Sequence, residues 1–470
     1  MKNNDNVYDV VIIGAGVAGL HAGFKLKNEG YNVLIVEADS VIGGRCRQDM
    51  TFTQYPVELG GELMHGGDTY FVKLAQEQKW ETFEVFSEDL FDSPKKSTYF
   101  YLGRERKLIR QDEIDDDITT LFQAFQEMHQ SIDLSNPNDG KDTNLLEYLV
   151  KQGVPYRVLG LADCIYSKTW GTNLDRIGLR EAVREDKKAH QIQKNFKLQG
   201  SNRILVDHLS KGQNILLNYR VSMIDYSNSI IFIQGPSQSS QSKILCKKVI
   251  VTVPLAILKE NDIKFLPELP ERKRDALSVF GMDGGMKIIC KFNRKFWLQN
   301  CELVLCADSA IPQIWMDGAP NRKVPQGKDA EFVTVGFITG DQAISISSLS
   351  PLYQIKAMLD QLDAMFGTPQ DWTPASSSYI SHITYDWKKN PYVRGAYSYP
   401  SIVPSSSYKY TESPSHILSE PLHERVYFAG EHTATEYELS TLNGALETGK
   451  RVYNEIIQTI SPKPNLQSKM

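Results

Sequence analysis

The stretch YDVVIIGAGVAGLHAGFKLKNEGYNVLIVE, residues 8–37, decides the fold of this chain. Its apolar run at 10–13 enters the glycine-rich turn GAGVAG at 14–19. A helix-like stretch and a second β-rich run follow, and that run ends at the acidic residue Glu37. This order predicts a strand, a turn, a helix and a second strand, the unit with which a dinucleotide-binding domain begins.

The three glycines of the turn each have a physical reason. Gly14 permits the tight turn, Gly16 lets the backbone approach a pyrophosphate, and Gly19 allows close helix packing. The free N–H groups at the helix start face the phosphates, and Glu37 stands at the spacing of a carboxylate that takes the ribose hydroxyls. Because strand, helix and acid all accompany the turn, the pattern favours a bound dinucleotide over an ordinary glycine-rich turn.

Length and composition limit the remaining possibilities. A chain of 470 residues is too long for one ordinary core, which predicts two domains. The net charge of −5 shows no signature of polyanion binding, so we expect no nucleic-acid partner. The six cysteines include no CxxC pair, which predicts free thiols in a reducing compartment and no metal site.

The two ends of the chain bear on its location. The polar start MKNNDNVYD leaves no room for a signal peptide, and no apolar stretch reaches the length of about 18 residues that a membrane span needs. We therefore expect a soluble, cytoplasmic protein without a membrane partner. The last residues, Ser468-Lys469-Met470, resemble a peroxisomal address of the S-K-L type. A polar tail that ends this way by chance is the alternative, and the sequence leaves both open.

Further motifs appear along the chain and resemble one family. They are the turn Gly43-Gly44-Arg45, the strand end VTVP at 251–254 and the block FAGEHTATEYELSTLNGALETGKR at 428–451. Together with the first glycine turn, and in this order, they resemble the flavin-containing amine oxidase superfamily, most closely its polyamine oxidases. The resemblance implies an α/β (α+β two-domain) fold, with a Rossmann-like FAD-binding domain and a mixed sheet-and-helix substrate domain.

The strand pattern is interrupted by a helical block and resumes after it, so both domains are expected to be discontinuous. The predicted segments are 1–75, 195–275 and 392–460 for the FAD-binding domain, 76–194 and 276–391 for the substrate-binding domain, and 461–470 for a polar tail.

The resemblance implies FAD as the cofactor. Ala396 stands where monoamine oxidases have the cysteine that attaches the flavin covalently, so FAD should be bound non-covalently. Its expected contacts are Gly14, Gly16, Gly19, Glu37, Gly44, Arg45, Gly60, Gly61, Val221, Trp387, Gly430, Glu431, Thr441 and Leu442.

Three positions resemble catalytic residues of the family. Lys287 matches the lysine that holds a water against flavin N5, although an outward-facing residue of a surface strand would look the same. Tyr397 falls on one wall of the family's aromatic cage. His65 matches a histidine beside the substrate tunnel of polyamine oxidases, and the alternative is a histidine that bonds to the backbone of a glycine-rich loop.

Two other residues concern the substrate. Thr441 replaces the second aromatic wall of the cage and leaves room for a bulkier or secondary amine. Glu62 could attract a polycation or lie on a solvated surface. The expected substrate residues are therefore His65, Glu62, Tyr397 and Thr441.

The implied reaction is oxidation of a polyamine-like or secondary amine to an imine. Hydride passes to flavin N5, and O2 reoxidises the flavin and gives hydrogen peroxide. The expected partners are the amine and O2, and the chain would act as a monomer or homodimer. The alternatives are a flavin-dependent isomerase or desaturase acting on a carbon–carbon bond, or an L-amino acid oxidase, although no arginine stands near Leu63 to bind a carboxylate.

Overall fold

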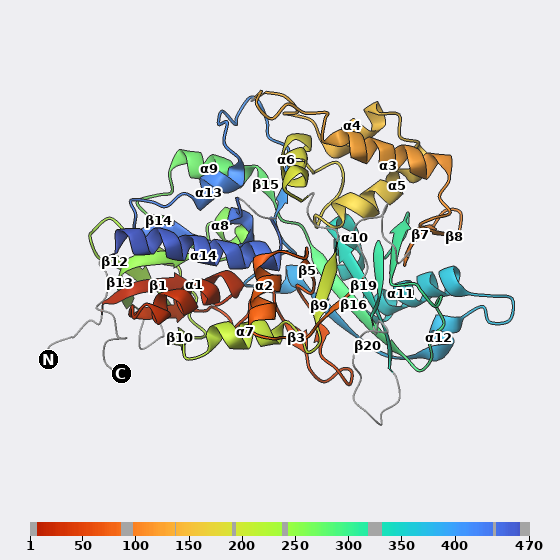
Figure 1. The fold of residues 1–470 in the computed structure, drawn as a ribbon, viewed down its shortest axis with the longest axis horizontal. Helices are drawn as coiled ribbons and strands as arrows, with labels where there is room; N and C mark the ends of the chain where they lie inside the picture. The colour runs from red at the N-terminus through yellow and green to blue at the C-terminus, as the bar shows by residue number, and fades with distance from the viewer. Residues whose placement is uncertain are drawn as a thin grey trace.

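The computed structural model describes residues 7–85, 97–136, 138–189, 194–236, 243–317, 331–435 and 439–460 (Figure 1). Its elements are arranged around two large sheets with helices packed on their faces. The tail 461–470, with Ser468-Lys469-Met470, lies outside the described residues.

Eight strands of the described chain form the first sheet. β1 runs parallel to β2 on one side and to β13 on the other, and β22 runs parallel to β13. All four residues of β2, VLIV, are buried, as expected for a parallel strand covered on both faces. In spatial order the strands are β10 (Ile215–Leu216), β2 (Val33–Val36), β1 (Tyr8–Ile13), β13 (Lys243–Val251), β12 (Ile231–Gln234), β11 (Met223–Asp225) and β14 (Lys264–Leu266), with β22 (Val426–Phe428) paired to β13.

Two helices from opposite ends of the chain lie side by side on this sheet (Figure 1). They are α1 (Val17–Asn28) and α14 (Leu442–Thr459), and Leu20 and Leu446 are buried in the core that they share with β1. The two backbones come close at Gly449, where a Cβ would lie 2.6 Å from the carbonyl oxygen of Ala18. The absence of a side chain there sets the distance between the helices.

Seven strands in the described ranges form the second sheet. Neighbouring strands are antiparallel except β7 and β17, which run parallel. In spatial order they are β20 (Tyr379–Asp386), β16 (Gly285–Phe292), β19 (Phe332–Thr339), β18 (Gln313–Asp317), β17 (Leu303–Ala307), β7 (Thr98–Leu102) and β8 (Lys107–Arg110).

Both faces of the second sheet are covered by helices, which explains its apolar strands. One core joins the sheet to α3, α4, α5 and α6, and a second core joins its other face to α10, α11 and α12. The helices are α3 (Asp116–Met128), α4 (Leu145–Lys151), α5 (Tyr156–Ala162), α6 (Leu179–Ala189), α10 (Gly340–Ser347), α11 (Pro351–Phe366) and α12 (Pro374–Ser378).

The remaining strands and α-helices of the described ranges are short. They are the strand pairs β3 (Gln48–Asp49) with β4 (Val57–Glu58) and β15 (Phe280–Gly281) with β21 (Tyr399–Pro400), the sheet of β5 (Met64–His65), β9 (Asn195–Leu198) and β6 (Thr82–Glu84), and the helices α2 (Tyr70–Glu77), α7 (Arg203–Ser210), α8 (Leu255–Lys259), α9 (Glu271–Ser278) and α13 (Pro414–Ser419).

Glu58, on β4, is a buried carboxylate at the start of α7. Its Oε1 accepts a hydrogen bond from the N–H of Asn202, 2.7 Å away. Burial raises the pKa of Glu58 to about 7; the Asn202 bond opposes that rise, and the neighbouring Glu62 adds to it. Glu58 therefore keeps its proton over a pH range in which the unfolded chain has already lost it.

The two-domain α/β fold expected from the sequence is confirmed, with a Rossmann-like first sheet and a mixed second sheet with helices. The residue boundaries assigned to the two domains stay a prediction. None of the helices in the described ranges is both long and apolar enough to cross a membrane.

The contact between α1 and α14 predicts the sign of one substitution. Helix propensity alone would make Gly449→Ala stabilising by about 1 kcal/mol. Because the added Cβ would meet the backbone of Ala18, we expect Gly449→Ala to lower the free energy of unfolding by about 2 kcal/mol, measured by urea denaturation. Asn454→Ala, an exposed position of the same helix, is the matched control and should stabilise slightly. A stabilised Gly449→Ala protein would contradict the close packing.

The buried Glu58 predicts a pH dependence of stability. An ordinary glutamate loses its proton near pH 4.5, whereas the folded chain holds that of Glu58 to about 7. Between these pH values the folded state binds more protons than the unfolded state, so the free energy of unfolding of the wild type falls as the pH rises. Glu58→Gln removes this decrease, because glutamine does not titrate. We expect the free energy of unfolding of Glu58→Gln to rise relative to wild type by up to about 3 kcal/mol from pH 4.5 to 7. Glu77→Gln, exposed on α2, should follow wild type throughout.

Candidate active site

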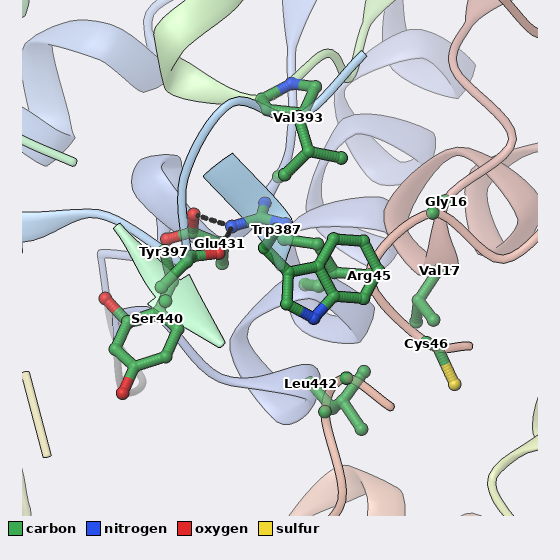
Figure 2. A pocket seen from close by; sticks show the side chains of 18 of the residues that line it. Gly16, Val17, Arg45, Cys46, Trp387, Val393, Tyr397, Glu431, Ser440 and Leu442 are labelled. Carbon is green, nitrogen blue, oxygen red and sulfur yellow. Dashed lines mark hydrogen bonds and ion pairs between the residues drawn. The ribbon is translucent and has the colours of Figure 1, made fainter. Parts of the chain in front are cut away.

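A cavity of about 600 Å³ extends from the glycine turn of the first sheet to the strands of the second sheet. Figure 2 shows part of its lining, including Gly16, Trp387 and Tyr397. The cavity brings together all the site residues named from the sequence except Gly19. Those that line it are Gly14, Gly16, Glu37, Gly44, Arg45, Gly60, Gly61, Glu62, His65, Val221, Lys287, Trp387, Tyr397, Gly430, Glu431, Thr441 and Leu442.

The glycine turn forms an open cradle at the start of α1. Gly14 has a φ of +110°, and a Cβ on Gly16 would meet no atom within 4 Å. Gly44, with a φ of +57°, lies against the backbone of Gly16. Gly19 is inside α1, where a Cβ would lie 2.1 Å from the carbonyl oxygen of Gly14. The free space at the N-terminus of α1 fits a pyrophosphate. Because Gly19 has no side chain, the backbone of the turn at Gly14 can pack closely against the helix.

Glu37 lies in the cavity just after β2. Its carboxylate accepts the N–H of Ala15 at 2.7 Å and that of Asp39 at 2.8 Å. Burial raises the pKa of Glu37, and these two hydrogen bonds oppose the rise. The carbonyl oxygen of Glu37 accepts the N–H of Tyr219, and this brings the segment with Val221 to the same wall. A fixed carboxylate beside the glycine turn fits the ribose of a dinucleotide.

An ion pair closes another wall of the cavity. A guanidinium nitrogen of Arg45 lies 2.7 Å from Oε1 of Glu431, and Figure 2 shows the pair as a dashed line. The hydroxyl of Ser398 donates to Oε2 of Glu431 at 2.5 Å. Burial alone would raise the pKa of Glu431, but Arg45, His432 and Ser398 together hold it below its usual value. Glu431 is therefore a buried, ionised acceptor that orients Arg45.

Trp387 and Gly60 meet at the middle of the cavity. The indole N–H of Trp387 donates to the carbonyl oxygen of Leu59 at 2.9 Å. A Cβ on Gly60 would lie 1.8 Å from the carbonyl oxygen of Arg45 and 2.8 Å from the Trp387 ring. The indole can therefore reach this position because residue 60 has no side chain.

The N-terminus of α14 opens into the cavity. Thr441 is the N-cap residue, and its hydroxyl accepts the N–H of Gly444 at 2.9 Å. Leu442 follows and packs against Gly61. The positive end of this helix dipole favours a ligand with negative charge.

The second sheet supplies a cation and an aromatic wall. Lys287, on β16, has its Nζ 5.0 Å from the centre of the Trp315 ring, and that ring stacks on Phe337 at 4.9 Å. Nζ also lies 2.6 Å from Glu62, whose other oxygen is 2.5 Å from Nζ of Lys197. Glu62, which the sequence offered to a polycationic substrate, thus has both carboxylate oxygens paired with lysines of the protein.

Tyr397 and His65 also line the cavity, away from the glycine turn. The hydroxyl of Tyr397 donates to the carbonyl oxygen of Thr169 at 2.8 Å, and its ring packs on Gly171, where φ is +78°. Nδ1 of His65 lies 2.8 Å from Oδ1 of Asn195, on the strand that pairs with β5. Because an amide oxygen only accepts, Nδ1 of His65 is the donor in this bond.

Several residues that line the cavity were missed from the sequence. Trp315 and Phe337 line the cavity together with Tyr166 and Asp186. The hydroxyl of Tyr166 donates to Asp186 at 2.9 Å. Burial raises the pKa of Asp186 to about 7, although the hydrogen bond from Tyr166 lowers it. Tyr166 lies in a π-helical turn, Asp163–Ser167, a local irregularity that is frequent at functional sites. Because side chains alternate along a strand, the sequence could have predicted that Gln313 and Trp315 share one face of β18. No sequence pattern indicated the π-helical turn or the role of Asp186.

Comparison with known proteins identifies the family of the chain. A family model described as flavin containing amine oxidoreductase matches residues 17–457. The chain is 26% identical over 460 residues to lysine-specific histone demethylase 2 of Homo sapiens, covering 95% of this chain and 53% of that protein. It is 24% identical over 471 residues to probable polyamine oxidase 4 of Arabidopsis thaliana, covering 96% of this chain and 87% of that protein.

A solved structure shows the same fold. Cyclohexylamine oxidase from Brevibacterium oxydans IH-35A superposes with a TM-score of 0.78 at 18% identity, covering 96% of this chain and 99% of that chain. The chain spans about half the length of the human demethylase and most of the length of the plant oxidase. Since the family model covers almost the whole sequence, the chain belongs to the flavin-containing amine oxidoreductase family.

Proposed function

We propose that the chain is an FAD-dependent oxidase of a polyamine-like or secondary amine, with O2 as the electron acceptor. One observation supports this most: the open cradle at Gly16 and the aromatic wall at Trp315 and Tyr397 line one continuous cavity. A cofactor on the cradle and an amine between the rings would therefore share one space. The polyamine oxidase among the relatives supports the substrate class.

The residues of the first sheet fit FAD. Glu37 would bind the ribose, the cradle the pyrophosphate, and Arg45 with Glu431 and the start of α14 the more distant part of the cofactor. Ala396 offers no thiol, so binding would be non-covalent. When bound, FAD supplies the hydride acceptor and the route for electrons to O2, with hydrogen peroxide as product.

The side chains of the cavity would bind and orient the amine and exclude water from it. Tyr397, Trp315 and Phe337 would hold its carbon chain and exclude water. Thr441 leaves room where a second cage ring would stand, which suits a secondary nitrogen. The hydrogen bond to Asn195 holds the ring of His65 in place. His65 would then set the direction in which the carbon chain of the amine lies.

The substrate class can be tested by anaerobic mixing. Purified protein would be mixed with spermine, spermidine, N-acetylated polyamines, simple monoamines and L-amino acids while the flavin absorbance is followed. We expect rapid bleaching by a polyamine and none by L-amino acids, and acid precipitation should release the flavin into solution. A yellow protein that no amine bleaches would contradict the proposal and favour chemistry on a carbon–carbon bond.

Two tyrosine variants connect this reaction to the cavity. Tyr397→Ala removes an aromatic wall and should slow bleaching by about tenfold or more. Tyr410→Ala is the control, because that ring lies beside Arg272, outside the residues that line the cavity. Equal slowing in both variants would show a general effect on the fold.

The Arg45 ion pair gives a second prediction, for cofactor affinity. Arg45→Met leaves the buried Glu431 without its guanidinium partner, and it removes a cation from the site proposed for the cofactor. We expect the dissociation constant of FAD to rise by about 100-fold, measured by fluorescence as FAD is titrated into FAD-free protein. Arg203→Met, in an exposed pair with Asp207, should bind FAD as wild type does. Unchanged affinity of Arg45→Met would exclude Arg45 from the FAD site.

A further inference from the structure

Three charged side chains are buried together beside the cavity. Lys287 comes from β16, Lys197 from β9, and Glu62 from the loop before β5. Glu62 lies 2.6 Å from Nζ of Lys287 and 2.5 Å from Nζ of Lys197. The exposed fractions of the three side chains are only 3% for Lys287, 3% for Glu62 and 6% for Lys197. One carboxylate thus joins two cations that water hardly reaches.

The hydrogen bonds of Lys287 are all made to the protein. Its Nζ donates to the carbonyl oxygens of Glu58 and Gly60, each at 3.0 Å, and to Oε2 of Glu62. An ammonium has three N–H groups, so each has a protein acceptor. Lys287 therefore presents a fixed positive charge to the cavity, rather than a spare N–H that a water could accept.

The carboxylate explains why this charge stays in place. A buried ammonium is stable only with an anion and hydrogen-bond acceptors, and a buried carboxylate needs cations in the same way. Glu62 satisfies Lys287 with one oxygen and Lys197 with the other. Since the lysines lie on strands of different sheets, Glu62 also fixes the second large sheet to the small sheet that supports His65.

We propose that Lys287, Glu62 and Lys197 act as one charge unit, in which Lys197 adds to, and Glu62 offsets, the positive charge that Lys287 presents to the cavity. The inference rests on the proposed function, because the charge acts on a flavin bound in the same cavity. Positive charge at this wall stabilises negative charge on the bound flavin. When Glu62 or Lys197 is changed, Lys287 keeps its acceptors at the carbonyl oxygens of Glu58 and Gly60. Since each member contributes one elementary charge, removing Lys197 and removing the carboxylate must act in opposite directions.

Sulfite binding measures the effect of these charges on the flavin without catalytic turnover. Sulfite is an anion that adds to oxidised flavin and bleaches it, so its dissociation constant for the FAD-loaded protein reports how well the cavity tolerates negative charge. Lys197→Met removes a cation and should weaken sulfite binding by about tenfold. Glu62→Gln removes an anion and should tighten sulfite binding by a similar factor. A purely structural role for either residue would not produce shifts of opposite sign.

The conservative variant and a surface lysine provide the controls. Lys197→Arg keeps the charge and should restore the wild-type dissociation constant for sulfite. Lys73→Met, whose side chain is 53% exposed and paired with Asp68, should not change it. Shifts in the same direction for Lys197→Met and Glu62→Gln, or no shift in either, would overturn the proposal.

Unfolding of the FAD-free protein separates this inference from the proposed function. The urea midpoints of Glu62→Gln, Lys197→Met and the double variant form a mutant cycle. We expect the double variant to lose clearly less stability than the two single losses together, because either single change already breaks the pair. A protein that takes up no FAD would contradict the proposed function, and the cycle then decides: additive losses would overturn the charge unit.

Discussion

A methyl group on Gly19 would lie 2.1 Å from the carbonyl oxygen of Gly14, and the rest of the structure depends on its absence. The tight turn between β1 and α1 leaves room for the side chain of Thr252, the residue that follows β13. The hydroxyl of Thr252 donates to the carbonyl oxygens of Ile13 and Gly14. β13 is thereby held in register beside β1, and β22 beside β13. The residues that follow β22 reach the cavity because this order of strands is fixed.

The candidate site consists of contacts between segments that are distant in the sequence. Arg45 and Glu431 are 386 residues apart, and Lys287 and Glu62 are 225 residues apart. Glu431 follows β22 of the first sheet, whereas Glu62 lies between β4 and β5, outside both large sheets. Burial and backbone acceptors fix the geometry of both pairs. Such pairs are stable because the protein excludes water from them, so the fold and the charges of the site support each other.

How much of this was predictable depends on the distance over which each signal acts. The unit of β1, α1 and β2 with Glu37 is local, so spacing alone predicted it. Trp315 and Phe337 were missed because their meeting depends on the register of antiparallel strands, which the sequence does not display. The pairing of Glu62 was missed for the same reason, since both of its lysines come from remote strands. All but one of the residues named from the family resemblance line the cavity, but the resemblance could not give their hydrogen-bond partners.

The side-by-side packing of α1 and α14 has a consequence for biosynthesis. The ribosome makes α1 long before α14, while the cavity needs both the turn before α1 and the N-cap of α14. The cofactor site therefore cannot exist on a half-made chain. Loading of the cofactor is confined to chains whose α14 has left the ribosome, and a chain truncated before α14 lacks that part of the site.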